Sequence, residues 1–89
     1  MKTERVTLCN RLGLHARAAS KLVSTAAEFQ SNVMVVRDDK RVNAKSIMGV
    51  LMLAAPVGTE LEIECDGSDE DDALKALVAL VDDRFGEGE

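Results

Sequence analysis

The sequence predicts an α+β fold in which three helices cover one face of a four-stranded antiparallel sheet, in the order β-α-β-β-α-β-α. Two patterns lead to this prediction. Several short segments alternate apolar with charged residues, which is typical of a sheet that has one face in water. Other segments repeat apolar residues every three or four positions, as amphipathic helices do. With 89 residues, 46% of them hydrophobic and 30% charged, the chain is expected to form a single domain over 1–89.

The first half of the chain contains three expected strands and one helix. Residues 4–10 form a strand with Val6 and Leu8 facing inward, and a loop follows over 11–15. Residues 32–37 and 41–43 are expected to pair as a hairpin, since aspartate in the intervening turn tolerates the backbone angles required. The helix runs from Ala16 to about Phe29, with an inward face formed by Ala19, Leu22, Val23, Ala26 and Phe29.

The second half adds a short helix, a strand and a long helix. Ser46 suits the N-cap of a helix over 47–53, which Pro56 terminates. Residues 59–65 form the last strand, and Ser68 is expected to cap the final helix. The inward residues are Leu61, Ile63 and Cys65 in this strand and Leu74, Leu77, Val78, Val81 and Phe85 in this helix. The last four residues, GEGE, are expected to fray.

Composition excludes several classes of function. The chain has no Trp or Tyr and only two Phe, so it lacks the aromatic faces on which nucleic-acid binders stack bases. No apolar run approaches the roughly 18 residues that span a bilayer, and the first residues do not form a signal peptide, so a cytoplasmic location is expected. Cys9 and Cys65 are expected to be free thiols, with no metal site and no cofactor.

Charge is distributed unevenly along the chain. Residues 1–21 contain five basic residues and one acid, whereas residues 57–89 contain twelve acids and two basic residues, and the net charge is −5. The basic segment includes His15, the only histidine. Such a field favours an anionic ligand or an acidic partner near His15.

His15 lies where the expected loop meets the first helix. The first amides of a helix have no intrahelical partners, so this position can bind an anion, and the Arg17 guanidinium suits phosphate oxygens. We therefore predict that His15 is a neutral, water-accessible ring that acts as a general base or accepts a phosphoryl group. A histidine that only packs or lies on the surface remains the alternative.

The expected short helix is apolar on nearly every side. Ile47, Met48 and Leu51 cannot all be buried by a helix on an open sheet. They form either a docking surface or a face covered by a loop or a second subunit. Ser46 is either only a helix cap or a phosphorylation site, where the helix dipole would accept the added charge.

Two segments carry a family resemblance. NRLGLHARAASKL (10–22) resembles the active-site segment of the HPr family, the histidine-containing phosphocarriers of the bacterial phosphoenolpyruvate:sugar phosphotransferase system, and KSIMGVLMLAA (45–55) resembles its serine segment. The resemblance implies an open-faced β-sandwich. It also implies that His15 accepts a phosphoryl group on Nδ1 from phosphorylated enzyme I and passes it to an enzyme IIA domain. The family has a proline where this chain has Ala18, which predicts a looser corner with an intact site.

The resemblance also implies roles for further residues. Arg17 would steady the phosphate, the backbone amides of Ala16 and Arg17 would bind its oxygens, and a kinase would modify Ser46. Ser20, Ile47, Met48 and Leu51 would contact partners.

The expected function is that of a monomeric carrier without turnover of its own. Its partners would be enzyme I, enzyme IIA domains and an HPr kinase/phosphorylase, with no nucleic acid and no membrane. One alternative is a regulatory family member, nitrogen-related or seryl-phosphorylated, that acts by binding partner proteins. Another is a small binding module whose histidine is incidental.

Overall fold

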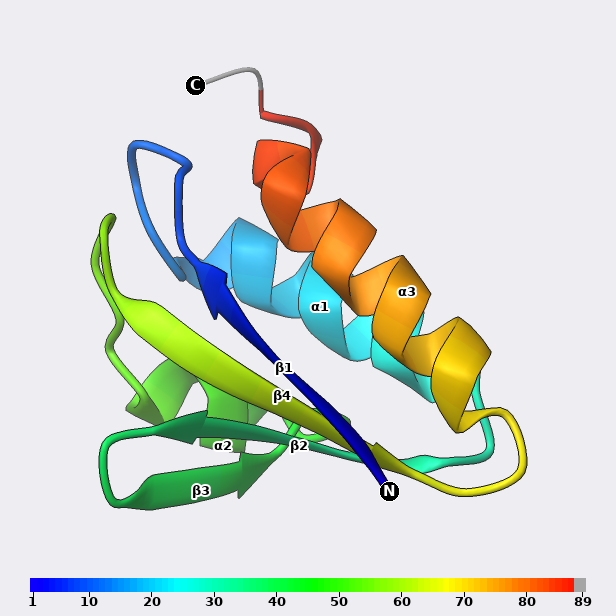
Figure 1. The fold of residues 1–89 in the computed structure, drawn as a ribbon. Helices are drawn as coiled ribbons and strands as arrows, with labels where there is room; N and C mark the ends of the chain where they lie inside the picture. The colour runs from blue at the N-terminus through cyan, green and yellow to red at the C-terminus, as the bar shows by residue number, and fades with distance from the viewer. Residues whose placement is uncertain (88–89) are drawn as a thin grey trace.

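A computed structural model describes residues 1–87 and confirms the predicted order of elements (Figure 1). The strands are β1 (Lys2–Thr7), β2 (Asn32–Arg37), β3 (Lys40–Asn43) and β4 (Glu60–Asp66). The helices are α1 (Ala16–Ala27), α2 (Ile47–Met52) and α3 (Glu70–Asp82), followed by the short 3-10 helix η1 (Arg84–Gly86). All strands pair antiparallel in the spatial order β1-β4-β2-β3, and the helices lie on one face of this sheet.

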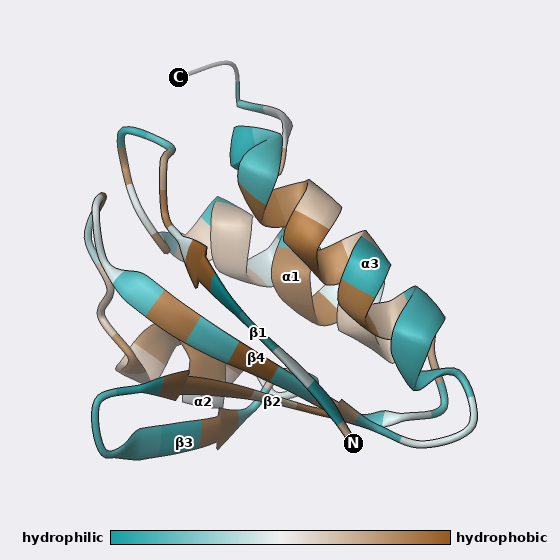
Figure 2. Ribbon diagram, viewed as in Figure 1, coloured by the Kyte–Doolittle hydropathy of each residue, from teal (hydrophilic) through white to brown (hydrophobic). Residues whose placement is uncertain are grey.

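The register of the sheet separates a buried face from an exposed one. Val6 of β1 pairs with Leu61 of β4, and Val35 of β2 pairs with Ile63, all of them buried under the helices. The intervening positions carry charge, and Figure 2 shows the resulting alternation of apolar and polar residues along β4. This period-two pattern follows from the pleat of a strand, so the predicted inward and outward faces are confirmed.

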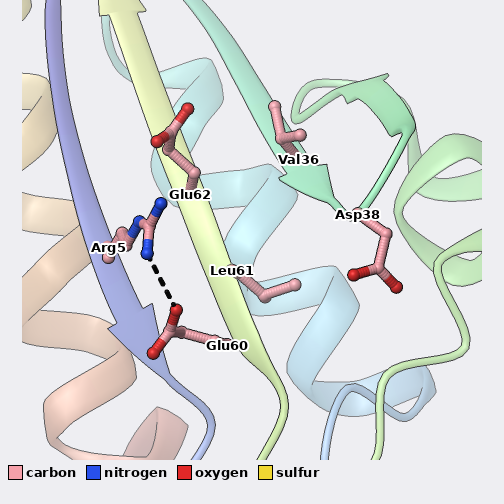
Figure 3. A pocket seen from close by; sticks show the side chains of 6 residues that line it. All are labelled: Arg5, Val36, Asp38, Glu60, Leu61 and Glu62. Carbon is pink, nitrogen blue, oxygen red and sulfur yellow. Dashed lines mark hydrogen bonds and ion pairs between the residues drawn. The ribbon is translucent and has the colours of Figure 1, made fainter.

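The open face of the sheet is lined by paired charges. Arg5 donates to Glu60 at 3.3 Å, and Arg41 donates to Glu64 at 2.9 Å. A shallow hollow of about 420 Å³ lies over Arg5, Glu60 and Glu62, and Figure 3 shows their side chains together. None of the residues that line this hollow lies around His15, so it belongs to a separate part of the surface.

The beginning of α3 differs from the prediction. Its N-cap is Asp69 rather than Ser68, and the Asp69 side chain makes no hydrogen bond to its own helix. The carboxylate instead accepts hydrogen bonds from the backbone amides of Gln30 and Ser31, each at 2.9 Å, and from the Ser31 hydroxyl. A contact made across the fold thus replaces the expected local cap.

The burial of both long helices also differs in part. Ala73, Leu77 and Val81 are the buried residues of α3, while Leu74 and Val78 are only half-buried. In α1, Ala19, Leu22 and Ala26 are buried as predicted, together with Ala18. Val23 and Phe29 pack against the core without full burial, and Phe29 follows the end of the helix.

The segment after α3 turns back onto the fold. Arg84 and Phe85 both have φ of 53°, a left-handed conformation, and Phe85 is buried. The prediction of fraying is wrong for Glu87, whose side chain contacts Asn10 and His15. Gly88 and Glu89, the other half of the expected frayed end, lie outside the described residues.

Neither a membrane-spanning helix nor a metal-binding cluster is found among the described residues. No helix within residues 1–87 is long and apolar enough to cross a membrane. In the same part of the chain, no three side chains among His, Cys, Asp and Glu gather in a way that could hold a metal ion.

Candidate functional site

His15 is the N-cap of α1, and a tight loop fixes its position. Gly13 has φ of +66°, and the Leu14 amide donates to the Ala55 carbonyl at 2.8 Å. A Cβ atom on Gly13 would lie 2.6 Å from that same carbonyl oxygen, so glycine is required by both conformation and space. Because Leu14 is buried, the next residue is held at the surface at the start of the helix.

The two ring nitrogens of His15 have different partners. Nδ1 accepts a hydrogen bond from the Arg17 backbone amide at 3.3 Å, so the imidazole caps its own helix. Nε2 is hydrogen-bonded to the Glu87 carboxylate. The side chain is 26% exposed, so the ring is partly accessible to water.

Glu87 is the part of this site that the sequence did not predict. One of its carboxylate oxygens contacts His15, and the other accepts from the Asn10 side-chain amide at 3.0 Å. Partial burial alone would raise the pKa of the Glu87 carboxyl. Hydrogen bonds from Asn10 and His15, with the nearby Arg17 charge, outweigh burial and lower that pKa below its ordinary value. The only signal in the sequence was the opposite charge of the chain's two ends.

Basic side chains surround the carboxylate. Arg11, Arg17 and Lys21 line a hollow of about 290 Å³ together with Glu87. The Lys21 ammonium also donates to the Phe85 carbonyl at 2.6 Å, which ties α1 to η1. Arg17 is exposed, so its guanidinium can reach an anion bound at His15.

The predicted phosphate-binding amides lie at the start of α1. Ala16 is the first residue of the helix and is exposed. The Arg17 amide, expected to be unpaired, already donates to His15. An anion that binds here would therefore have to replace the imidazole as the hydrogen-bond acceptor of the Arg17 amide.

The serine segment begins a second helix. Ser46 is the N-cap of α2, as predicted, and its hydroxyl accepts from the Gly49 amide at 3.2 Å. Val50 and Leu53 are buried beneath it. The bond between Leu14 and Ala55 connects the loop before α1 to the loop after α2, so the two predicted sites share one support.

The predicted partner-binding residues differ in exposure. Ile47 and Met48 are exposed, with Met48 at 67%, whereas Leu51 is half-buried against the core. Ser20 is exposed on α1. Met52, 69% exposed, and Leu12 were not singled out from the sequence but belong to the same set of exposed apolar side chains.

Comparison with known proteins agrees with this arrangement. A family model described as "PTS HPr component phosphorylation site" matches residues 2–83. The phosphocarrier protein HPr of Neisseria meningitidis is 52% identical over 89 residues, which is all of both chains. A crystal structure of HPr from Thermoanaerobacter tengcongensis has a TM-score of 0.95 at 45% identity and covers 98% of each chain. These relatives favour a phosphocarrier over a purely regulatory family member.

A further structure bears on the expectation of a monomer. It is described as an HPr dimer from Thermoanaerobacter tengcongensis, with a TM-score of 0.79 and 45% identity. It covers 98% of this chain and all of its own. A monomeric state therefore does not follow from the fold.

Three lines of evidence now agree. The sheet and helices match those of solved HPr structures, the family model spans nearly all of the chain, and a half-exposed histidine lies at a helix start among basic side chains. This chain belongs to the HPr family of phosphocarriers.

Proposed function

We propose that this protein accepts a phosphoryl group on His15 Nδ1 from phosphorylated enzyme I and passes it to an enzyme IIA domain in the cytoplasm. It acts as a relay that cycles between His15 and phospho-His15, without turnover of its own. The observation that carries the proposal is that Nδ1 faces a helix-start amide while the ring stays partly exposed to solvent.

The site can hold a phosphoryl group without rearranging the fold. The 3.3 Å bond from the Arg17 amide to Nδ1 is long, so little is lost when a phosphate oxygen takes the place of the nitrogen. The Arg17 guanidinium can form charge-assisted hydrogen bonds to the same phosphate. The amide of Ala16, the first residue of α1, is assigned to another phosphate oxygen.

Partner docking is assigned to the exposed apolar side chains near the site. Ile47 and Met48 on α2, with Leu12 in the loop before α1, offer a surface that can be buried against another protein. Methionine is flexible and polarisable, which suits a carrier that must bind a donor and an acceptor in turn. Ser20, exposed on α1, and the half-buried Leu51 are assigned to the same docking surface.

Ser46 is assigned a regulatory role. A phosphate on its hydroxyl would carry a charge of about −1.5 to −2 at pH 7 and would lie at the positive end of α2. The helix would be preserved, but the neighbouring Ile47 and Met48 would no longer present a neutral surface. An HPr kinase/phosphorylase would control phosphocarrier activity in this way.

The experiment is phosphorylation by phosphoenolpyruvate and enzyme I, followed by mass spectrometry. We expect one acid-labile phosphate on the wild type and on Ser46→Ala, and none on His15→Ala, because only the imidazole forms a phosphoramidate. An unmodified wild type, or a His15→Ala variant that still gains the phosphate, would contradict the proposal.

A further inference from the structure

Glu87 reaches His15 from the far end of the chain and uses both of its oxygens. One contacts His15 Nε2, and the other accepts from the Asn10 side-chain amide. The Glu87 side chain is only 10% exposed. The same Asn10 amide donates to the Gly13 carbonyl at 2.7 Å, so one buried side chain joins the histidine loop to the carboxylate.

The segment that carries Glu87 is anchored at Phe85. Phe85 is buried, and the Lys21 ammonium holds its carbonyl oxygen. The left-handed conformations of Arg84 and Phe85 turn the chain back toward α1. This turn therefore places the Glu87 carboxylate against the His15 ring.

The partners of the ring fix the position of its proton. An ionised carboxylate can only accept, so Nε2 must carry a hydrogen to bond with Glu87. A backbone amide can only donate, so Nδ1 must present its lone pair to Arg17. Both contacts select the same neutral tautomer, with the proton on Nε2 and the lone pair on Nδ1.

From this geometry we propose that Glu87 is a positioning residue that keeps the His15 proton on Nε2 and compensates the charge that the ring gains on phosphorylation. This inference rests on the proposed phosphocarrier function. In the transfer, the Nδ1 lone pair attacks phosphorus, and the bond from phosphorus to the donor's phosphohistidine nitrogen breaks. That nitrogen keeps the electron pair, and the proton on Nε2 stays hydrogen-bonded to Glu87.

The charged groups near the ring are of both signs. Glu87 faces Nε2 and opposes the positive charge of a phosphorylated imidazole. Arg11, Arg17 and Lys21 line the hollow around it and are suited to the negative phosphate. Removing the carboxylate would leave the positive charge of the ring without this opposing group at Nε2.

The experiment compares the wild type with Glu87→Gln, which keeps the size of the side chain and removes its charge. Asp83→Asn is the matched control, because Asp83 is exposed in the same segment and also loses one negative charge. The first readout is the ¹⁵N chemical shifts of the His15 ring near pH 8.5, about two units above the ordinary histidine pKa. We expect the Nε2–H tautomer to dominate in the wild type and in Asp83→Asn, and to lose that dominance in Glu87→Gln.

The second readout is the ratio of phosphorylated to free protein at a fixed ratio of phosphoenolpyruvate to pyruvate with enzyme I. Loss of one charge-assisted hydrogen bond should lower this ratio roughly tenfold in Glu87→Gln. Glu87→Asp keeps the charge but shortens the side chain, so it should give an intermediate value. Asp83→Asn should match the wild type.

The outcomes are distinguishable. If Glu87→Gln matches the wild type in both readouts, or is phosphorylated more fully, Glu87 is only an anchor or an obstruction and the inference is wrong. A wild type that takes no phosphate would contradict the proposed function. The tautomer measurement needs no phosphate, so it would still decide whether Glu87 positions the proton.

Discussion

Two helices in this protein begin with a side chain that both caps the helix and is assigned a phosphate. His15 Nδ1 accepts from the Arg17 amide at the start of α1, and the Ser46 hydroxyl accepts from the Gly49 amide at the start of α2. Their surroundings differ. The His15 corner gathers charged groups from distant parts of the chain, whereas Ser46 is followed by the exposed apolar side chains of Ile47 and Met48.

Under the proposed function, this difference separates a site for chemistry from a site for control. At His15, basic groups can bind the phosphate and Glu87 can face the ring, so a phosphoryl group can be received and released. At Ser46 the same group would meet helix amides and lie next to the exposed Ile47 and Met48, so its effect would fall on docking. Helix starts alone do not define function; the residues brought to them do.

The largest expected effect comes from disrupting the support of the His15 corner. Gly13→Ala should lower the free energy of unfolding by about 2–4 kcal/mol, through left-handed strain and overlap with a backbone carbonyl. Urea denaturation would measure the change. Phosphoryl acceptance at His15 should fall in the same variant, because the loop that positions the ring must move.

Gly58→Ala is the matched control for this prediction. Gly58 also has a positive φ, of 87°, but a Cβ there would meet no atom within 4 Å. Strain alone should cost about 1–2 kcal/mol, with phosphoryl acceptance unchanged. Equal losses of stability in the two variants would show that the overlap between the added Cβ atom at position 13 and the Ala55 carbonyl contributes nothing.

A smaller effect is expected at the second corner. Ser46→Ala removes the hydrogen bond to the Gly49 amide and should cost about 1 kcal/mol in urea denaturation. Ser46→Asp retains an N-cap acceptor, so stability should stay near that of the wild type while transfer from enzyme I slows. If Ser46→Asp transferred phosphate at the normal rate, the assignment of control to this corner would be wrong.

The smallest effect is confined to acid pH and extends the comparison to the start of α3. Hydrogen bonds from the Ser31 side chain and the Gln30 amide lower the pKa of the Asp69 carboxyl below its ordinary 3.8. A lowered folded-state pKa gives stability that is present above the ordinary value and is lost as pH falls through the folded value. The free energy of unfolding should therefore decline below about pH 4.

Asp69→Asn tests this prediction, because it removes the titrating group. Its stability should vary less with acid pH than that of the wild type, when both are measured by urea denaturation across the same range. Part of the decline should remain, since the pKa values of Glu70 and Glu87 are also lowered. If the free energy of unfolding changed with pH in the same way in both proteins, Asp69 would not contribute to the decline.

The elements that sequence predicted correctly are those whose signal is local. Alternation in β4 depends only on the pleat of one strand, and the Ser46 cap depends on residues within three positions. The location of His15 at a helix start was predictable for the same reason. The family resemblance supplied the roles of the residues, which no spacing could have specified.

The predictions from sequence were wrong where a side chain contacts a residue far away in the chain. Asp69 caps the backbone near Ser31 instead of its own helix, and Phe85 is buried by a left-handed turn instead of a helical stripe. Glu87 lies next to His15 although 72 positions separate them. These contacts depend on how the helices pack on the sheet, so no local pattern records them.

The position of Glu87 has a practical consequence for labelling the protein. A group attached at Glu87 would lie beside the imidazole. The Met1 amine, in contrast, lies 3.3 Å from Glu70 at the opposite end of α3, and a helix of 13 residues is about 20 Å long. Purification tags and fluorophores used in transfer assays therefore belong at the amino terminus, where they leave the reacting ring unobstructed.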